Sequence, residues 1–112
     1  MPEVTQLEKL LKMQQDDAKH VARLEALTRL HNNKDFKELI LQHFLIDDCA
    51  ANAHNGANIG WPVEKRNDCL VMAAAAGHFK NYMMGVERAG MQAVARADEL
   101  AEAIVEAQQG DA

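Results

Sequence analysis

The second half of the chain carries the longest regular alternation of apolar and polar positions. Apolar or small residues recur in steps of four and three from residue 72 to residue 107, and Cys69 extends the series backward by one step. The series is Cys69, Met72, Ala76, Phe79, Met83, Val86, Gly90, Ala93, Ala97, Leu100, Ile104 and Ala107. This spacing is typical of a helix that packs along its length against another helix. We call the series the seam. It predicts one helix over residues 62–108, with the seam residues forming an interface.

The seam contains few bulky side chains, and this affects how it can pack. Ala and Gly fill about half of its positions, and small residues let two helices approach toward the lower end of the usual spacing of about 8–10 Å. Three glycines of this segment, Gly77, Gly85 and Gly90, each cost about 1 kcal/mol relative to alanine inside a helix. Either another helix packs closely over them, or they mark kinks or a break near Gly85 that divides the segment in two.

A first helix is predicted over residues 4–31. Thr5 and Glu8 have the spacing of a capping box at its start. Apolar side chains then share one face until polar residues at positions 14–17 interrupt it. The leucines that follow step by three, so the apolar stripe rotates around the helix, and we expect its two ends to meet different neighbours.

A second helix is predicted over residues 35–51, where Asp35 and Glu38 repeat the capping-box spacing. This segment has the densest bulky hydrophobic content in the chain, and its broad apolar surface implies burial on more than one side. We expect a core at the end of the helical bundle, made of Phe36, Leu39, Ile40, Phe44 and Trp61.

Residues 52–61 are predicted to form the main loop, because Asn55-Gly56 and Gly60 are turn signals and Pro62 suits a first helical turn. Trp61 is either an anchor that closes the end of the bundle or an exposed contact for a partner. The predicted architecture is all-α. It is a single elongated helical domain over residues 1–112, a long antiparallel, coiled-coil-like hairpin with a short middle helix.

Charge and hydropathy narrow the function classes. The net charge is −5 and no block is rich in Lys and Arg, so direct nucleic-acid binding through a basic patch is not expected. The apolar runs are far shorter than about 18 residues, and the N-terminus lacks a secretory apolar region. We therefore expect a soluble, unexported protein without membrane contact. Its cysteines, Cys49 and Cys69, are expected to be free and buried.

Candidate chemistry is sparse. His43, Asp47, Cys49 and His54 lie near one another in sequence, but Cys49 falls on a different helical face from His43, unlike a typical zinc pattern. The chain has no glycine-rich phosphate loop, no Ser/His/Asp motif and no HExxH motif. We therefore predict no catalytic residue, no metal site and no cofactor, which describes a protein that is not an enzyme.

The last third of the long helix is acidic. Its carboxylates, Asp98, Glu99, Glu102 and Glu106, face Arg96 alone. Negative charge near a helix C-terminus opposes the helix dipole. We expect this end to fray unless a basic partner or a neighbouring chain holds it.

Residues 24–50 resemble part of a known family. The matching positions are Asn33, Asp35, Phe36, Lys37, Leu39, Ile40, Leu41 and Phe44. They resemble small helical proteins encoded among the virion genes of tailed bacteriophages, in which a leucine-rich helix runs into an Asn-x-Asp-Phe-Lys-x-Leu-Ile-Leu stretch. The match covers about a quarter of the chain. Lys34 stands where proline is commoner, and the long helix is richer in alanine than in the family.

The resemblance implies a phage origin and an accessory structural or assembly role, in the virion or in the host cytoplasm, and it supplies no catalytic residue. We predict a homo-oligomer, most simply a dimer, that associates through its helices with itself and with other virion proteins. The alternative is a small acidic phage-encoded modulator that docks on a host enzyme or nucleic-acid-binding protein through Glu99, Glu102 and Glu106.

Overall fold

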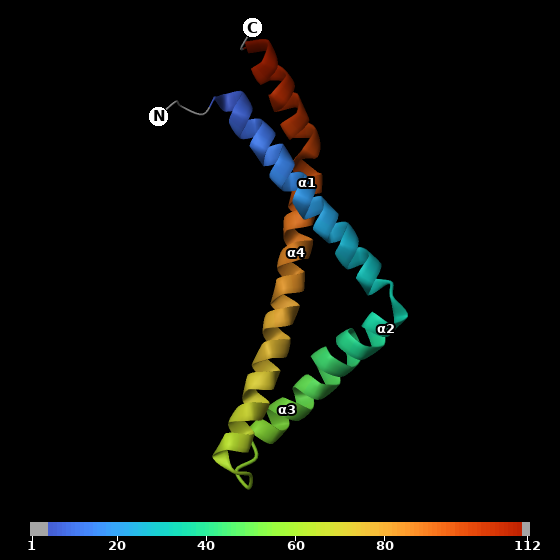
Figure 1. Ribbon diagram of the computed structural model, residues 1–112, viewed down its shortest axis with the longest axis vertical. Helices are drawn as coiled ribbons and strands as arrows, with labels where there is room; N and C mark the ends of the chain where they lie inside the picture. The colour runs from blue at the N-terminus through green and yellow to red at the C-terminus, as the bar shows by residue number, and fades with distance from the viewer. Residues whose placement is uncertain (1–4, 111–112) are drawn as a thin grey trace. The chain divides into compact units, whose positions relative to one another are not determined.

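The computed structural model describes residues 5–110, and all regular structure in this range is helical (Figure 1). Helix α1 spans Gln6–His31 and helix α4 spans Val63–Gly110. Between them, α2 (Lys34–Phe36), the π-helix η1 (Lys37–Asp48) and α3 (Cys49–Gly56) follow one another without a break, and we call them the middle helix. The prediction of an all-α fold with three helices is confirmed.

The first helix begins and ends close to its predicted bounds. The backbone N–H of Glu8 donates to Oγ1 of Thr5 at 3.1 Å, so Thr5 caps the helix as expected. Residue 4, the predicted first residue, lies outside the described residues. The helix ends at His31, and the backbone N–H of Asn33 donates to the carbonyl of Leu30 to form the turn that follows.

The middle helix differs from prediction at its start. Its N-cap is Asn33, whose Oδ1 accepts the backbone N–H of Phe36 at 2.9 Å. The prediction that Asp35 caps this helix is wrong. Asp35 lies in the first turn instead, where its charge favours the helix dipole. Asparagine and aspartate are nearly equivalent caps, so the sequence alone could not choose between them.

The middle helix also continues past its predicted end and stops at Gly56, not at residue 51. At this end the helix packs closely against α4, because Gly56 is buried and a Cβ there would lie 2.4 Å from Cδ2 of Leu70. The loop therefore spans only residues 57–62. It is tightened by Asn58, which accepts the N–H of Gly60 at Oδ1 and the N–H of Trp61 at its carbonyl, both at 3.0 Å.

Helix α4 is continuous through Gly85, so the alternative of a break there is wrong. It also extends to Gly110, slightly beyond the predicted end at residue 108. The acidic last third is helical over its described length. No helix within residues 5–110 combines the length and the apolar character needed to cross a membrane.

The chain divides into two compact units. The first unit combines residues up to Leu27 with residues from Val86 onward, and the second contains residues 28–85. In the first unit α1 and α4 are antiparallel, because Asp17 bonds Arg96 whereas Leu24 lies against Gly90. The long helix thus packs against the first one, as the predicted hairpin requires.

The second unit is also an antiparallel helix pair. Phe44 pairs with Phe79, Cys49 lies against Ala73, and Gly56 faces Leu70, so residue numbers rise along the middle helix as they fall along α4. The prediction of a single elongated domain over residues 1–112 stays a prediction. The two units share helices α1 and α4, because the boundaries between them fall at residues 27/28 and 85/86.

Candidate association surface

Most seam residues are removed from solvent. Ala76, Met83, Gly90, Ala93, Leu100 and Ile104 are buried, whereas Cys69, Val86 and Ala107 are half-buried. The exposed seam residues are Met72, Phe79 and Ala97. The heptad spacing thus locates the inner side of α4 correctly over most of its length. The neighbours seen at this side belong to the same chain, namely α1 in the first unit and the middle helix in the second. The prediction that the seam also forms an interface between chains stays a prediction.

A glycine allows α1 and α4 to approach each other closely in the first unit. A Cβ on Gly90 would lie 2.5 Å from Cβ of Leu24 and 3.1 Å from the backbone oxygen of His20. A side chain at this position would therefore push the two helices apart. By contrast, a Cβ on Gly77 or Gly85 would meet nothing within 4 Å. Only Gly90, of the three seam-segment glycines, has the tight packing that the sequence offered as an explanation.

The residues predicted to form the bundle-end core fall into separate contacts. The ring centroids of Phe44 and Phe79 are 6.3 Å apart in an edge-to-face pair, and Phe36 lies 5.9 Å from the ring of His31. Trp61 is half-buried, with Nζ of Lys65 4.3 Å from its ring centroid. The cationic neighbour of Trp61 therefore comes from the first turn of α4. Ile40, another residue of the predicted core, is half-buried.

Leu39 departs from the predicted core, because it is 63% exposed. The π-helical winding of η1 is the physical reason. Its hydrogen bonds reach five residues back, so side chains about four to five positions apart share a face. The half-buried positions follow this wider step: Phe36, Ile40, Leu41, Phe44, Leu45 and Cys49. The α-helical projection placed Leu39 on the same side as Phe36 and Phe44, whereas the structure leaves Leu39 exposed.

An ion pair that the sequence reading missed joins the two helices of the first unit. Nε of Arg96 donates to Oδ2 of Asp17 at 2.7 Å, and a second Arg96 nitrogen donates to Oδ1. The Asp17 side chain is only 8% exposed, whereas that of Arg96 is about half exposed. The Arg96 hydrogen bond holds the pKa of the Asp17 carboxyl below its ordinary value, against the opposing effect of burial.

The ion pair bears on the expected surroundings of the carboxylates at the acidic end of α4. Arg96 was expected to face the carboxylates at 98–106, but it is engaged by Asp17 from α1. The sequence contained only a weak signal for the Asp17–Arg96 pair. Asp17 belongs to the polar interruption at positions 14–17 of an otherwise apolar face. A charged residue on such a face needs a partner from another helix.

A groove runs between α1 and α4 beside this ion pair. It has a volume of about 450 Å³. Its walls are mostly small apolar side chains, with Gln14, Asp17 and Glu25 as the polar contributions. The apolar lining consists of Ala18, Val21, Ala22, Ala93, Val94, Ala97 and Leu100. We call this the alanine groove.

The residues considered for metal or nucleophilic chemistry do not converge. Nδ1 of His43 lies 3.3 Å from Oδ2 of Asp47 in an exposed pair one turn apart. Sγ of Cys49 instead points to the backbone oxygen of Ala73 at 3.7 Å. Both cysteines are free and half-buried, not fully buried as expected. Within residues 5–110 there is no group of three or more His, Cys, Asp or Glu side chains placed to hold a metal ion.

Comparison with protein-family models, with curated proteins and with solved structures found no match for this chain. The likeness of residues 24–50 to virion proteins of tailed bacteriophages therefore stays a prediction from the sequence.

Proposed function

We propose that this chain is a non-enzymatic helical protein that acts by helix–helix association with itself and with other components of an assembly. The observation that carries the proposal is the apolar surface left open within each of the two units: Val94 of the first unit is 57% exposed, and Tyr82 of the second is 66% exposed.

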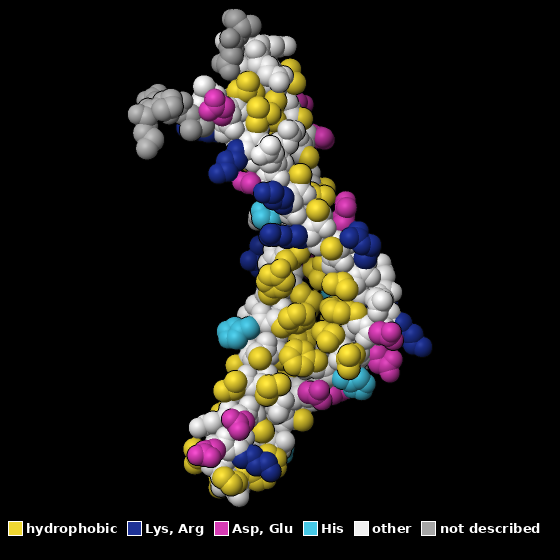
Figure 2. All heavy atoms as spheres, in the orientation of Figure 1, with side chains coloured by type: hydrophobic (Ala, Val, Ile, Leu, Met, Phe, Trp, Pro, Cys, Tyr) yellow, Lys and Arg dark blue, Asp and Glu magenta, His cyan; other side chains and the backbone are white. Residues whose placement is uncertain are grey.

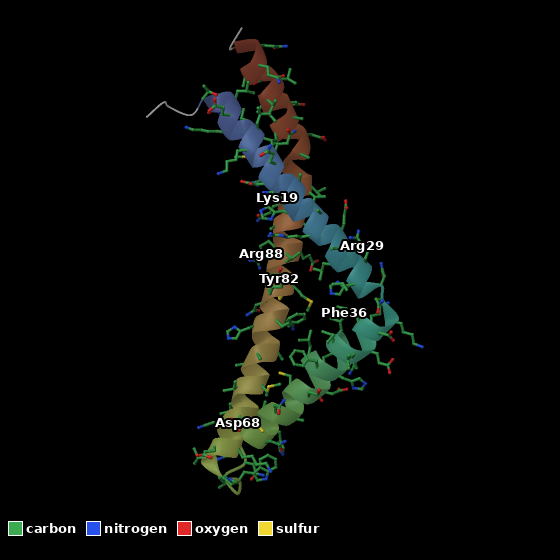
Figure 3. The ribbon with its side chains drawn as sticks, in the orientation of Figure 1. Lys19, Arg29, Phe36, Asp68, Tyr82 and Arg88 are labelled. Atoms are coloured by element: carbon green, nitrogen blue, oxygen red, sulfur yellow. The ribbon has the colours of Figure 1, made fainter. Side chains whose placement is uncertain are left out.

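The open surface includes many large apolar side chains. Among the described residues, sixteen large hydrophobic side chains are exposed, and no large side chain is fully buried. Tyr82, labelled on α4 in Figure 3, and Val71 are each 66% exposed. Figure 2 shows hydrophobic side chains gathered on one face of the second unit. Apolar surface on this scale is typical of proteins that bury it against partners.

Two helices per unit explain the incomplete core. An amphipathic helix buries a stripe of its surface against a neighbour, and a single pair of helices can enclose one seam but not a three-dimensional core. Helix bundles complete the core with further helices. Further helices supplied by other chains would complete both units in the same way.

The virion setting of the proposal is supported by the resemblance over residues 33–44. In this setting the chain is an accessory structural or assembly component of a tailed phage. Mass spectrometry of purified particles tests it. Presence at many copies per particle supports the proposal, whereas absence from both particles and assembly intermediates contradicts it.

A second candidate function is favoured by the acidic end of α4. Glu99, Glu102 and Glu106 are exposed, and the nearest base in sequence, Arg96, is engaged by Asp17. This surface suits a basic partner, as expected for a small modulator of a host enzyme or nucleic-acid-binding protein. A pull-down from infected cells distinguishes the two candidates, because a modulator would recover a single host protein and would be missing from the particle.

A further inference from the structure

We infer that the alanine groove of the first unit is filled by the same groove of a second copy, so that two α1–α4 pairs form a four-helix bundle about a two-fold axis. The inference deepens the proposed association function and rests on it. It assigns self-association to the open side of the α1–α4 pair, which includes the exposed seam residue Ala97, because the other seam residues of this unit are buried or half-buried inside the chain.

The groove has the side chains that close helix packing needs. Val94 and Ala97 are three positions apart, which places them on one side of α4, and both are exposed. Ala18 and Ala22 of α1 line the opposite wall and are exposed as well. Small side chains on both helices let a second pair approach to about 8 Å, at the close end of helix packing.

The helix arrangement of the first unit fits a second copy, because the unit is a single antiparallel α1–α4 pair with the alanine groove on its open side. A four-helix bundle built from two helical hairpins is an established way to cover the open side of each hairpin.

The charges of the groove also favour a copy of the same chain. In a two-fold interface each surface meets itself, so a groove with a strong net charge would repel its own copy. Here the charge of Asp17 is neutralised by Arg96 within the same chain. The remaining charge of the lining belongs to Glu25, which is exposed to water. Apart from Glu25, the lining of the groove therefore carries no uncompensated charge.

The first test compares two identical substitutions by sedimentation equilibrium of the full chain. Val94→Asp puts a carboxylate into the groove, where Val94 is 57% exposed before association. Val71→Asp is the matched control, because Val71 lies on the same helix in the second unit and is 66% exposed. We expect a dimeric wild-type protein, a dimer dissociation constant raised about 100-fold or more by Val94→Asp, and no comparable change for Val71→Asp.

The possible failures differ in what they overturn. A wild-type chain that stays monomeric at micromolar concentration overturns both the inference and the self-association part of the proposed function. A dimer that is broken by Val71→Asp but not by Val94→Asp overturns the inference alone, because association then uses the second unit.

A cross-linking test covers the case in which Val94→Asp fails to fold. In a background with both native cysteines replaced by alanine, Ala97→Cys places one thiol in the lining of the groove. Ala74→Cys, also exposed on α4 but in the second unit, is the matched control. Under mild oxidation we expect disulfide-linked dimers to form at least about tenfold faster for Ala97→Cys. Equal or inverted rates overturn the inference.

Discussion

At the scale of single residues, the Asp17–Arg96 pair links segments that are 79 positions apart in the sequence. A carboxylate that is almost fully buried needs both of its oxygens satisfied, and the guanidinium group supplies two parallel donors. Replacing one residue of such a pair leaves the charge of the other residue without a partner. The pair therefore selects the register in which α1 and α4 of the first unit pack.

The pH dependence of stability follows from this pair. The folded pKa of Asp17 lies below its ordinary value, so the unfolded chain takes up the proton more readily. The ionised pair stabilises the fold above the ordinary carboxyl pKa, and this contribution is lost as pH falls through the lower folded pKa. We expect the difference in unfolding free energy between wild type and Asp17→Asn to be largest near neutral pH and to shrink in acid.

Urea denaturation at a series of pH values measures that difference. Asp16→Asn serves as the control, because Asp16 is the exposed neighbour of Asp17. A difference between wild type and Asp17→Asn that is the same at pH 7 and in acid would show that the Arg96 contact does not stabilise the ionised carboxyl.

Two glycines of α4 provide a second residue-scale prediction. Gly90→Ala introduces a Cβ 2.5 Å from Cβ of Leu24, an atom that moves only with its backbone. We expect a loss of about 1–3 kcal/mol from overpacking, which exceeds the gain in helix propensity. Gly85→Ala meets nothing within 4 Å and should stabilise by up to about 1 kcal/mol. Thermal unfolding of both variants measures the contrast, and equal effects would rule out the close helix approach at Gly90.

At the scale of elements, the middle helix is the part whose winding differs from expectation. Its π-helical segment η1 spans 12 residues, whereas such segments are usually single turns inside α-helices. The wider winding lets both Phe44 and Leu45 lie on the half-buried side. The edge-to-face contact of Phe44 with Phe79 of α4 shows which helix this side faces.

A matched leucine pair tests the winding. Leu45 is half-buried and Leu39 is 63% exposed. We expect Leu45→Ala to lower the unfolding free energy by about 2 kcal/mol, at the low end for buried leucines. Leu39→Ala should change it by no more than about 0.5 kcal/mol. Chemical denaturation of the two variants gives the answer. A larger loss for Leu39→Ala would instead support ordinary α-helical winding with the predicted inward face.

At the scale of the whole molecule, each unit contains a single helix pair, and much apolar surface is open. If self-association completes the fold as proposed, unfolding is linked to dissociation, and the melting temperature depends on protein concentration. We expect it to rise over a hundredfold increase in concentration for wild type, and to be nearly constant for Val94→Asp. Circular dichroism melts measure both. A concentration-independent wild-type melt would contradict a dimer whose folding and association are coupled.

The sequence by itself determined α1, α4 and most of the inner side of α4. These are local properties: the cap at Thr5 acts over three residues, and the alternation of three and four along the seam follows from helix geometry whatever the neighbour. The inner side therefore came out correctly at Met83 and Leu100 without knowledge of what covers them. The inward face of the middle helix was predicted only in part, because the prediction used an α-helical period whereas η1 is a π-helix.

The tertiary structure alone decided the pairing of Asp17 with Arg96, the glycine at which the helices come closest, and the alanine groove. Each depends on which side chains of α1 meet which side chains of α4, and this register is a property of two packed surfaces taken together. Heptad spacing contains no information on it, because a shift by seven residues preserves the same pattern. The buried charge and the missing Cβ of Gly90 distinguish one register from its alternatives.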